Sequence, residues 1–316
     1  MSPEMITVKI RSIRIEAEDI RSFELVSTDG SSLPAWSPGA HVMVGVAGLQ
    51  RAYSLCNHLR ERNGYRIAVK LEPQSRGGSR AMHALRVGDT LQISAPRTLF
   101  ELDASAQRHV LLAGGIGITP LYAMFNALRG MAACELHYFV RSAAQAAFVD
   151  QLGVEARLYS GFEPAQTAEA LAEIIRPHAD DSRTTFYTCG PAPFMAAVEA
   201  ALSAAGVPAE QLRSERFAAA PAAPGSGDGR FHIVFARSGV EADVPSGVPI
   251  IQVARECGVD IPTSCEQGVC GACLSDVIEG QPEHLDAYLS DEERAGGKIM
   301  LPCVSRCQGP RLVLDR

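Results

Sequence analysis

Residues 264–273 read Ser-Cys-Glu-Gln-Gly-Val-Cys-Gly-Ala-Cys, and a further cysteine, Cys303, follows after a long gap. Within this stretch four residues separate Cys265 from Cys270, and two residues separate Cys270 from Cys273. Three thiolates on one short loop, with a distant fourth, are the ligand spacing of a two-iron two-sulfur cluster. The motif therefore predicts that these four cysteines hold such a cluster.

The loop must fold tightly, because three thiolates from one short segment have to converge on two irons. Gly268 and Gly271 permit the backbone angles that a tight loop needs, and amides aimed at the sulfurs would stabilise a negative cluster. A zinc site and metal-free buried cysteines are the alternatives. Zinc sites usually contain two short cysteine pairs, whereas this segment has one close pair, Cys270 and Cys273.

The segments around the cysteine loop predict a small α+β domain over residues 230–316. A strand over 231–235 leads into a turn at residues 237–239. A helix follows, and its apolar face carries Ile250, Val253, Ala254 and Cys257. This order of hairpin, helix and cysteine loop is that of a β-grasp ferredoxin domain.

The other cysteines lack ligand spacing. An odd total of 9 cysteines, without a secretion signal, argues against a disulfide framework. Buried cysteine usually behaves as a small hydrophobic residue. That is the expectation for Cys56, Cys134, Cys307 and, on the core-facing side of its helix, Cys257.

Changes in composition divide the rest of the chain. Residues 218–229 read AAAPAAPGSGDG, which is linker composition and suits a monomer that docks and releases a partner. Residues 1–103 contain short strands split by turn signals, which predicts an antiparallel β-barrel. Residues 104–217 alternate strands and helices, which predicts an α/β domain whose parallel sheet is covered on both faces.

A glycine-rich turn, residues 114–120 (Gly-Gly-Ile-Gly-Ile-Thr-Pro), follows the apolar strand over 109–113 and opens a helix. Its glycines allow close backbone approach, and amides at the start of a helix favour a pyrophosphate. The turn is not a GxGxxG motif, and alone it is a weak signal. A later strand ends in Cys189-Gly190-Pro191, and the carboxyl ends of parallel strands border one crevice. Together the two turns predict a nucleotide site.

The barrel segment contains Arg51-Ala52-Tyr53-Ser54 on one predicted strand. An arginine can hold a phosphate in a charge-assisted hydrogen bond, and a serine hydroxyl can donate near a flavin nitrogen. Lys70 and the stretch Arg76-Gly77-Gly78-Ser79 supply further donors for a phosphate. Singly, each could be a strand edge or a hairpin loop. In this order, they resemble the flavin signature of the ferredoxin–NADP reductase superfamily, an arginine, an aromatic residue and a serine on one barrel strand.

These stretches resemble the ferredoxin–NADP reductase superfamily. With a C-terminal ferredoxin domain, the whole chain resembles the family of phthalate dioxygenase reductase and the vanillate O-demethylase reductases. The matching stretches are RAYSLCN, AVK followed by RGGS, AGGIGITP, YTCGP, SCEQGVCGAC and LPCVSR. The resemblance implies FMN in the barrel (1–103), NADH rather than NADPH in the α/β domain (104–217), and a Rieske-type terminal oxygenase as acceptor.

The resemblance also implies roles for individual residues. Those at the flavin would be Arg51, Ala52, Tyr53, Ser54, Val69, Lys70, Arg76, Gly77, Gly78 and Ser79. Those at the nucleotide would be Gly115, Gly117, Thr119, Pro120, Arg141, Cys189, Gly190 and Pro191. Glu215 and Phe217 would close over the flavin and, with Ser54 and Cys189, act in catalysis. For Phe217, a place in the hydrophobic core is the alternative.

Arg141 bears on the choice of nucleotide. It follows the strand that ends at Val140, where an acidic residue would have indicated NADH through its ribose hydroxyl. An arginine at that position could instead meet a 2′-phosphate.

The overall charge and hydropathy exclude several classes of protein. A net charge of −7 gives no basic surface for nucleic acid. No apolar run approaches the roughly 20 residues that span a bilayer. The N-terminus lacks the basic and apolar regions of a signal peptide, so the cytoplasm is the expected location.

The sequence therefore predicts a reductase that passes electrons from NADH through FMN to its own cluster and on to an oxygenase. A flavin would bridge a two-electron donor and a one-electron acceptor. The alternatives are a reductase for a non-Rieske iron hydroxylase and a non-catalytic redox sensor.

Overall fold

The computed structural model describes residues 5–58, 61, 63–74, 77–153, 155–217, 229–263, 265–269 and 271–316. The chain forms two compact units, one of Met1–Gly48 with Ala52–Arg216 and one of Leu49–Arg51 with Phe217–Arg316. Arg76, Cys270 and residues 218–228 of the predicted linker lie outside the described residues.

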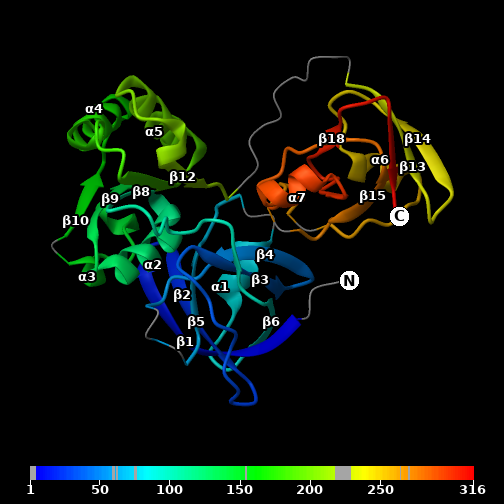
Figure 1. Cartoon of the computed structure of the whole chain (residues 1–316). Helices are drawn as coiled ribbons and strands as arrows, with labels where there is room; N and C mark the ends of the chain where they lie inside the picture. The colour runs from blue at the N-terminus through cyan, green and yellow to red at the C-terminus, as the bar shows by residue number, and fades with distance from the viewer. Residues whose placement is uncertain are drawn as a thin grey trace. The chain divides into compact units, whose positions relative to one another are not determined.

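The first part of the chain folds into an antiparallel barrel (Figure 1). Its strands run in the order β4-β3-β6-β1-β2-β5, and β7 pairs with β3. A bridge between Leu55, directly after β4, and Ile67 of β5 joins the two ends of this order. The elements are β1 (Met5–Ala17), β2 (Ile20–Ser27), β3 (Ala40–Val46), β4 (Leu49–Ser54), β5 (Tyr65–Lys70), α1 (Gly78–Ala84), β6 (Thr90–Ser94) and β7 (Arg97–Thr98).

The barrel forms because alternate strand residues are apolar and fill its interior. In β1, Val8 and Ile10 are fully buried, while Thr7 and Lys9 between and beside them are exposed. Leu25 on β2, the register partner of Ile10, is buried as well, and so is Phe23 on the same strand. The period of two therefore sets the barrel core.

A five-stranded parallel sheet follows, in the order β10-β9-β8-β11-β12. Alternate residues of β8 face opposite layers: Leu111 packs with α2, and Val110 packs with α4 and α5. Helices thus cover both faces (Figure 1), as predicted. The elements are β8 (Arg108–Gly114), α2 (Ile118–Leu128), β9 (Ala133–Val140), α3 (Val149–Leu152), β10 (Ala156–Ser160), α4 (Pro164–Ile175), β11 (Thr184–Cys189), α5 (Ala192–Ala204) and β12 (Leu212–Glu215).

The barrel and the parallel sheet share one hydrophobic core. Ile20 and Phe100 of the barrel segment pack in the same cluster as Leu111 of β8. In that cluster Tyr122 stacks on Phe148, with ring centroids 4.6 Å apart and planes inclined by 7°. Because this core is continuous, the barrel and the sheet form a single body.

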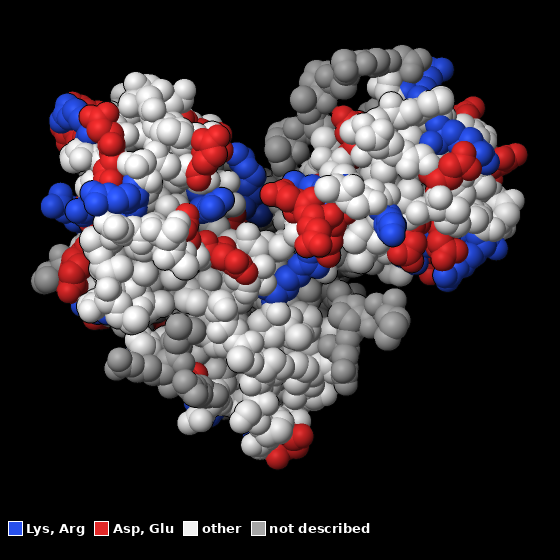
Figure 2. Space-filling view, viewed as in Figure 1, with Lys and Arg blue, Asp and Glu red and all other residues white. Residues whose placement is uncertain are grey.

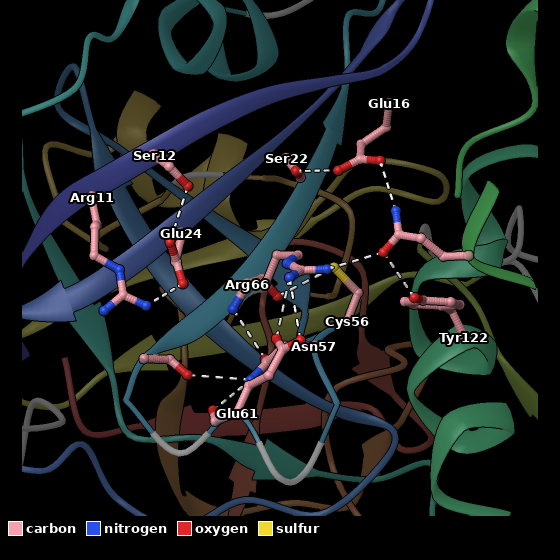
Figure 3. A network of polar contacts seen from close by, with 12 residues as sticks. Arg11, Ser12, Glu16, Ser22, Glu24, Cys56, Asn57, Glu61, Arg66 and Tyr122 are labelled. Atoms are coloured by element: carbon pink, nitrogen blue, oxygen red, sulfur yellow. Dashed lines mark hydrogen bonds and ion pairs between the residues drawn. The ribbon is translucent and has the colours of Figure 1, made fainter. Parts of the chain in front are cut away.

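A network of polar contacts includes two residues of the shared core, Cys56 and Tyr122 (Figure 3). Glu16 of β1 accepts hydrogen bonds from Ser22 Oγ at 2.5 Å and from Gln151 Nε2 at 3.4 Å. On the sheet side, the Tyr122 hydroxyl donates to Gln151 Oε1 at 3.0 Å. Arg66 of β5 donates to the same amide oxygen at 3.4 Å. Gln151 therefore links two barrel strands to α2 and α3.

The second unit contains a mixed sheet in the order β14-β13-β19-β15-β17 and a separate pair of β16 with β18. Helix α6 buries Ile250, Val253 and Ala254 in its core, which confirms the β-grasp prediction. The elements are β13 (Phe231–Phe235), β14 (Val240–Val244), α6 (Ile250–Glu256), β15 (Ser275–Glu279), β16 (Pro282–Glu283), α7 (Asp291–Gly296), β17 (Ile299–Met300), β18 (Arg306–Cys307) and β19 (Arg311–Leu314).

One expectation about the cysteines is wrong. Helix α6 ends at Glu256, so Cys257 caps the helix and leaves its apolar face, and the side chain is exposed. Cys56 is buried as expected, and Cys134 and Cys307 are partly buried.

The described surface is mixed in charge. Figure 2 shows basic and acidic side chains scattered over the visible face, with much uncharged surface between them. Among the described residues, no helix is both long and apolar enough to cross a membrane. The domain boundaries that the sequence predicts, 1–103, 104–217, 218–229 and 230–316, stay predictions.

Replacing Gly39 by alanine should destabilise the first unit much more than the same change at Gly30. Both glycines have positive φ angles, +87° and +80°, which cost an alanine about 1–2 kcal/mol. At Gly39 a Cβ would also lie 1.8 Å from the Phe100 carbonyl oxygen, whereas at Gly30 it would meet nothing within 4 Å. We expect a further loss of about 1–3 kcal/mol for Gly39→Ala, measured by urea unfolding. Equal losses in the two variants would contradict this packing.

Candidate functional site

The two turns predicted to bind a nucleotide, residues 114–120 and Cys189–Pro191, lie against each other at the carboxyl end of the parallel sheet. We call this contact between the two turns the crossing. From the central strand β8 the chain proceeds to β9 and β10 on one side, and later returns to β11 and β12 on the other. The topological switch point therefore lies between β8 and β11, and ligands of open α/β sheets bind at such a point. A Cβ on Gly117 would lie 2.1 Å from the Cys189 carbonyl oxygen, so the close approach of the turns requires glycine there.

The surroundings of the crossing differ from residue to residue. Gly115 has a φ of +53°, and a Cβ built there meets nothing within 4 Å, so its backbone borders open space. Thr119 is buried, and its hydroxyl donates to the Ile116 carbonyl at 3.1 Å, which stabilises the start of α2. Pro120 is also buried in α2. Arg141 is exposed directly after β9.

Phe194 was not singled out from the sequence, although it belongs to this crossing. Cβ atoms built on Gly114 and Gly190 would lie 2.7 and 2.9 Å from its ring. The ring therefore fills the space between the two turns. Its position soon after Pro191, in the first turn of α5, was the available signal.

Three predicted catalytic residues lie together where the barrel meets this edge of the sheet. Ser54, buried at the end of β4, donates a hydrogen bond to Glu215 Oε2 at 3.5 Å. Glu215 ends β12 and is the register partner of Cys189 at the end of β11. These three side chains thus come from three strand ends.

The protonation of this group follows from its burial. Burial raises the pKa of Glu215 to about 8, against the hydrogen bond from Ser54, which lowers it. Burial, together with the nearby Glu215, raises the pKa of the Cys189 thiol well above its usual range. Near neutral pH the site therefore presents a protonated carboxyl, a thiol and a hydroxyl.

Phe217 was predicted either to cover the flavin or to lie in the core. It directly precedes the undescribed residues 218–228, and it is 39% exposed. An exposed ring does not fit the core alternative.

The predicted flavin residues of the barrel occupy β4 and β5. Arg51 Nη1 donates to the Gln50 carbonyl at 2.8 Å, and Tyr53 packs against the barrel core. Val69 is buried, and the Lys70 ammonium lies 3.5 Å from a Glu72 carboxylate oxygen. Ala52 lies between Arg51 and Tyr53 and is partly buried.

The predicted phosphate turn precedes and begins α1. Gly77, with a φ of +99°, is the residue before the helix, and Gly78 is buried at its start. The Ser79 hydroxyl accepts a hydrogen bond from the Glu72 amide at 3.2 Å. Arg76 lies outside the described residues.

The cysteine loop of the second unit buries its thiols. Cys265, Cys273 and Cys303 are 3%, 2% and 5% exposed. The hydrogen-bonded Cys273 thiol and burial raise the pKa of the Cys303 thiol, while the amide of Gly268, which faces the sulfur, opposes that rise. The Gln267 amide donates to Cys265 Sγ at 3.2 Å.

This donor set fits an iron–sulfur cluster, because buried sulfur ligands with amides on the sulfurs suit a negative group. Cys270, the fourth predicted ligand, lies outside the described residues. Within the described part of the chain, no three His, Cys, Asp or Glu side chains surround the position of a single metal ion. A two-iron cluster divides its thiolates between two irons, so its ligands need not converge on one point.

Comparison with known proteins agrees with the description of the cysteine loop and with that of the whole chain. Residues 233–308 match the 2Fe-2S iron-sulfur cluster binding domain family. The vanillate O-demethylase oxidoreductase of Pseudomonas putida is 43% identical over 98% of this chain and 100% of its own length.

Solved structures are similar over 99% of this chain, and two of them bear on its function. Phthalate dioxygenase reductase, described as a modular structure for electron transfer from pyridine nucleotides to [2Fe-2S], is 33% identical, with a TM-score of 0.70 over 98% of its length. An intact type IV self-sufficient cytochrome P450 monooxygenase is 34% identical, with a TM-score of 0.82 over 41% of its length.

The raised pKa of Glu215 predicts a pH-dependent stability. Because the folded chain holds a proton that the unfolded chain releases above about pH 4.5, the free energy of unfolding should fall as pH rises toward 8. In Glu215→Gln this part of the fall is absent. Urea unfolding at about pH 5, 6.5 and 8 measures it, and Glu210→Gln, at an exposed site, serves as the matched control. Parallel curves for wild type and Glu215→Gln would show that Glu215 is ionised in the folded chain.

Proposed function

This chain belongs to the family of the vanillate O-demethylase oxidoreductases and phthalate dioxygenase reductase, and we propose that it carries electrons from NADH through FMN and its own [2Fe–2S] cluster to a terminal oxygenase. As a member it is an oxidoreductase with a cluster-binding domain. One observation carries the proposal: a loop of buried thiols and a nucleotide crevice bordered by a barrel occur on one chain.

The barrel residues would hold the flavin. Arg51 and the turn Gly77–Ser79 would bind the FMN phosphate, and Tyr53 and Ser54 would contact the ring system. When bound, FMN accepts two electrons from a nicotinamide and releases them one at a time. Lys70 and Arg76 would add positive charge for the phosphate.

Glu215 would help the Ser54 hydroxyl to donate a hydrogen bond to the flavin. In this structure Ser54 donates to Glu215 Oε2 at 3.5 Å. When a flavin nitrogen accepts the Ser54 hydrogen, the Glu215 carboxyl, which burial keeps protonated near neutral pH, would donate to the Ser54 oxygen instead. The hydrogen of Ser54 is then available for a flavin nitrogen. Neutral side chains here also avoid repelling the negative charge of a reduced flavin.

The crossing turns would hold the nucleotide. Gly115, whose backbone borders open space, would face the pyrophosphate, while Gly117 and Gly190 allow the two turns to pack closely. Cys189 and Pro191 would lie beside the nicotinamide ring. Arg141, at the end of β9, would face the adenosine ribose. Pyridine nucleotides are the electron donors of the similar phthalate dioxygenase reductase, which supports a nucleotide of this class here. NADH in particular is proposed on the family resemblance.

The cluster would be held by Cys265, Cys270, Cys273 and Cys303, with the amides of Gln267 and Gly268 on two of the sulfurs. The proposed acceptor is a Rieske-type oxygenase, since the relatives include vanillate O-demethylase oxidoreductases. A haem monooxygenase is the second candidate acceptor, favoured by the likeness to the self-sufficient cytochrome P450. Rapid turnover with NADH and an artificial acceptor would distinguish a reductase for either of these acceptors from a non-catalytic redox sensor.

Removing one cluster ligand should separate flavin reduction by NADH from electron transfer to an external acceptor. In Cys265→Ser we expect flavin reduction by NADH at the wild-type rate and cytochrome c reduction at the background rate, both by stopped-flow absorbance. Cys257→Ser is the matched control, because Cys257 is exposed and has no ligand spacing. Wild-type cytochrome c reduction by Cys265→Ser would mean that electrons bypass the cluster.

A further inference from the structure

Asp286 is a fully buried carboxylate in the segment between β16 and α7. Its Oδ2 accepts hydrogen bonds from the amides of Tyr288 at 3.1 Å and Leu289 at 2.8 Å. Its Oδ1 accepts one from the Ser305 hydroxyl at 3.2 Å. Because both oxygens act as acceptors, the geometry is that of an ionised carboxylate.

The segment that Asp286 organises lies directly on the cysteine loop. The amide of Ala287 donates to the Gly268 carbonyl at 2.9 Å. A Cβ on Gly268 would lie 3.0 Å from the Asp286 Cα atom, so no side chain separates the two backbones. The amide of the same Gly268 faces the sulfur of Cys303. Gly268 thus links the Asp286 segment to a predicted cluster ligand.

Two further contacts tie Asp286 to the ligands. A Cβ on Gly271 would lie 2.3 Å from the ring of Tyr288, whose amide Asp286 holds. Ser305, two residues after Cys303, is 1% exposed and also accepts a hydrogen bond from the Leu285 amide at 3.3 Å. Through these contacts Asp286 holds the backbone next to two parts of the predicted cluster site, the cysteine loop at Gly271 and the segment after Cys303.

An arginine and a histidine face this carboxylate. Arg294 Nη2 lies 3.8 Å from Asp286 Oδ2 and donates to the Asp286 carbonyl at 2.6 Å, and its side chain is 34% exposed. His284 Nδ1 lies 3.6 Å from Oδ1 and is positive only when protonated. Solvent screens the partly exposed arginine more than the fully buried carboxylate, so the carboxylate dominates the local field.

We propose that Asp286 is a positioning residue for the iron–sulfur cluster, and that its buried negative charge makes the cluster harder to reduce. Reduction adds one negative charge to the cluster, which a carboxylate one backbone layer away opposes. Asp286 also orders the segment from which the Ala287 amide donates to the Gly268 carbonyl, beside Cys303. This role rests on cluster binding in the C-terminal domain and not on the identity of the flavin or the oxygenase.

The test is the midpoint potential of the cluster in the full-length protein, measured by an EPR-monitored redox titration at about pH 8, where histidine is ordinarily neutral. Asp286→Asn keeps the shape of the side chain and removes its charge. We expect a midpoint potential more positive than in the wild type. Asp291→Asn, the same change at an exposed residue of α7, should shift the potential much less.

Arg294→Gln gives a second arm with the opposite sign, because removing the cation leaves the carboxylate less compensated. We expect a midpoint potential more negative than in the wild type. If Asp286→Asn keeps the cluster spectrum but its potential equals that of Asp291→Asn, the proposal is overturned. If Asp286→Asn does not retain a cluster, Arg294→Gln decides: a negative shift supports the proposal, and an unchanged or positive potential overturns it.

Discussion

The close approach of Gly117 to the Cys189 carbonyl is the contact on which the nucleotide half of the molecule depends. It brings the turn after β8 against the turn after β11, since a Cβ at Gly117 would lie only 2.1 Å from that oxygen. The crossing places Cys189 and its register partner Glu215 at the same sheet edge. The core shared by the barrel and the sheet then brings Ser54 to within 3.5 Å of Glu215.

Two carboxyl groups, the partly buried Glu215 and the buried Asp286, show how surroundings and hydrogen bonds set charge in this chain. Glu215 has the Ser54 hydroxyl as its donor at 3.5 Å, and burial keeps it protonated near neutral pH. Asp286 has three donors within 3.2 Å, including two backbone amides, and these stabilise a negative charge. The part of the proposed flavin site formed by Ser54 and Glu215 is thus neutral, whereas the cysteine loop lies beside an ionised group. Such a contrast favours electrons at the flavin over electrons at the cluster.

Local patterns in the sequence predicted the fold class well. Cysteine spacing, glycine turns and strand periodicity are each contained in short segments, and they predicted the barrel, the parallel sheet and the ferredoxin-like domain. Asp286, Gln151 and Phe194 were missed because their roles depend on contacts between segments distant in sequence. Cys257 was misplaced because helical periodicity does not reveal that the helix ends one residue earlier.

The most direct test of the proposed electron path is an anaerobic absorbance titration of the purified protein with NADH, with NADPH in parallel. The proposal predicts bleaching of a flavin band together with loss of the broad cluster absorbance, complete near about 1.5 equivalents of NADH, because the flavin takes two electrons and the cluster one. A flavin that is reduced while the cluster stays oxidised would contradict transfer between them. Absence of a flavin band would contradict the proposed role of the barrel.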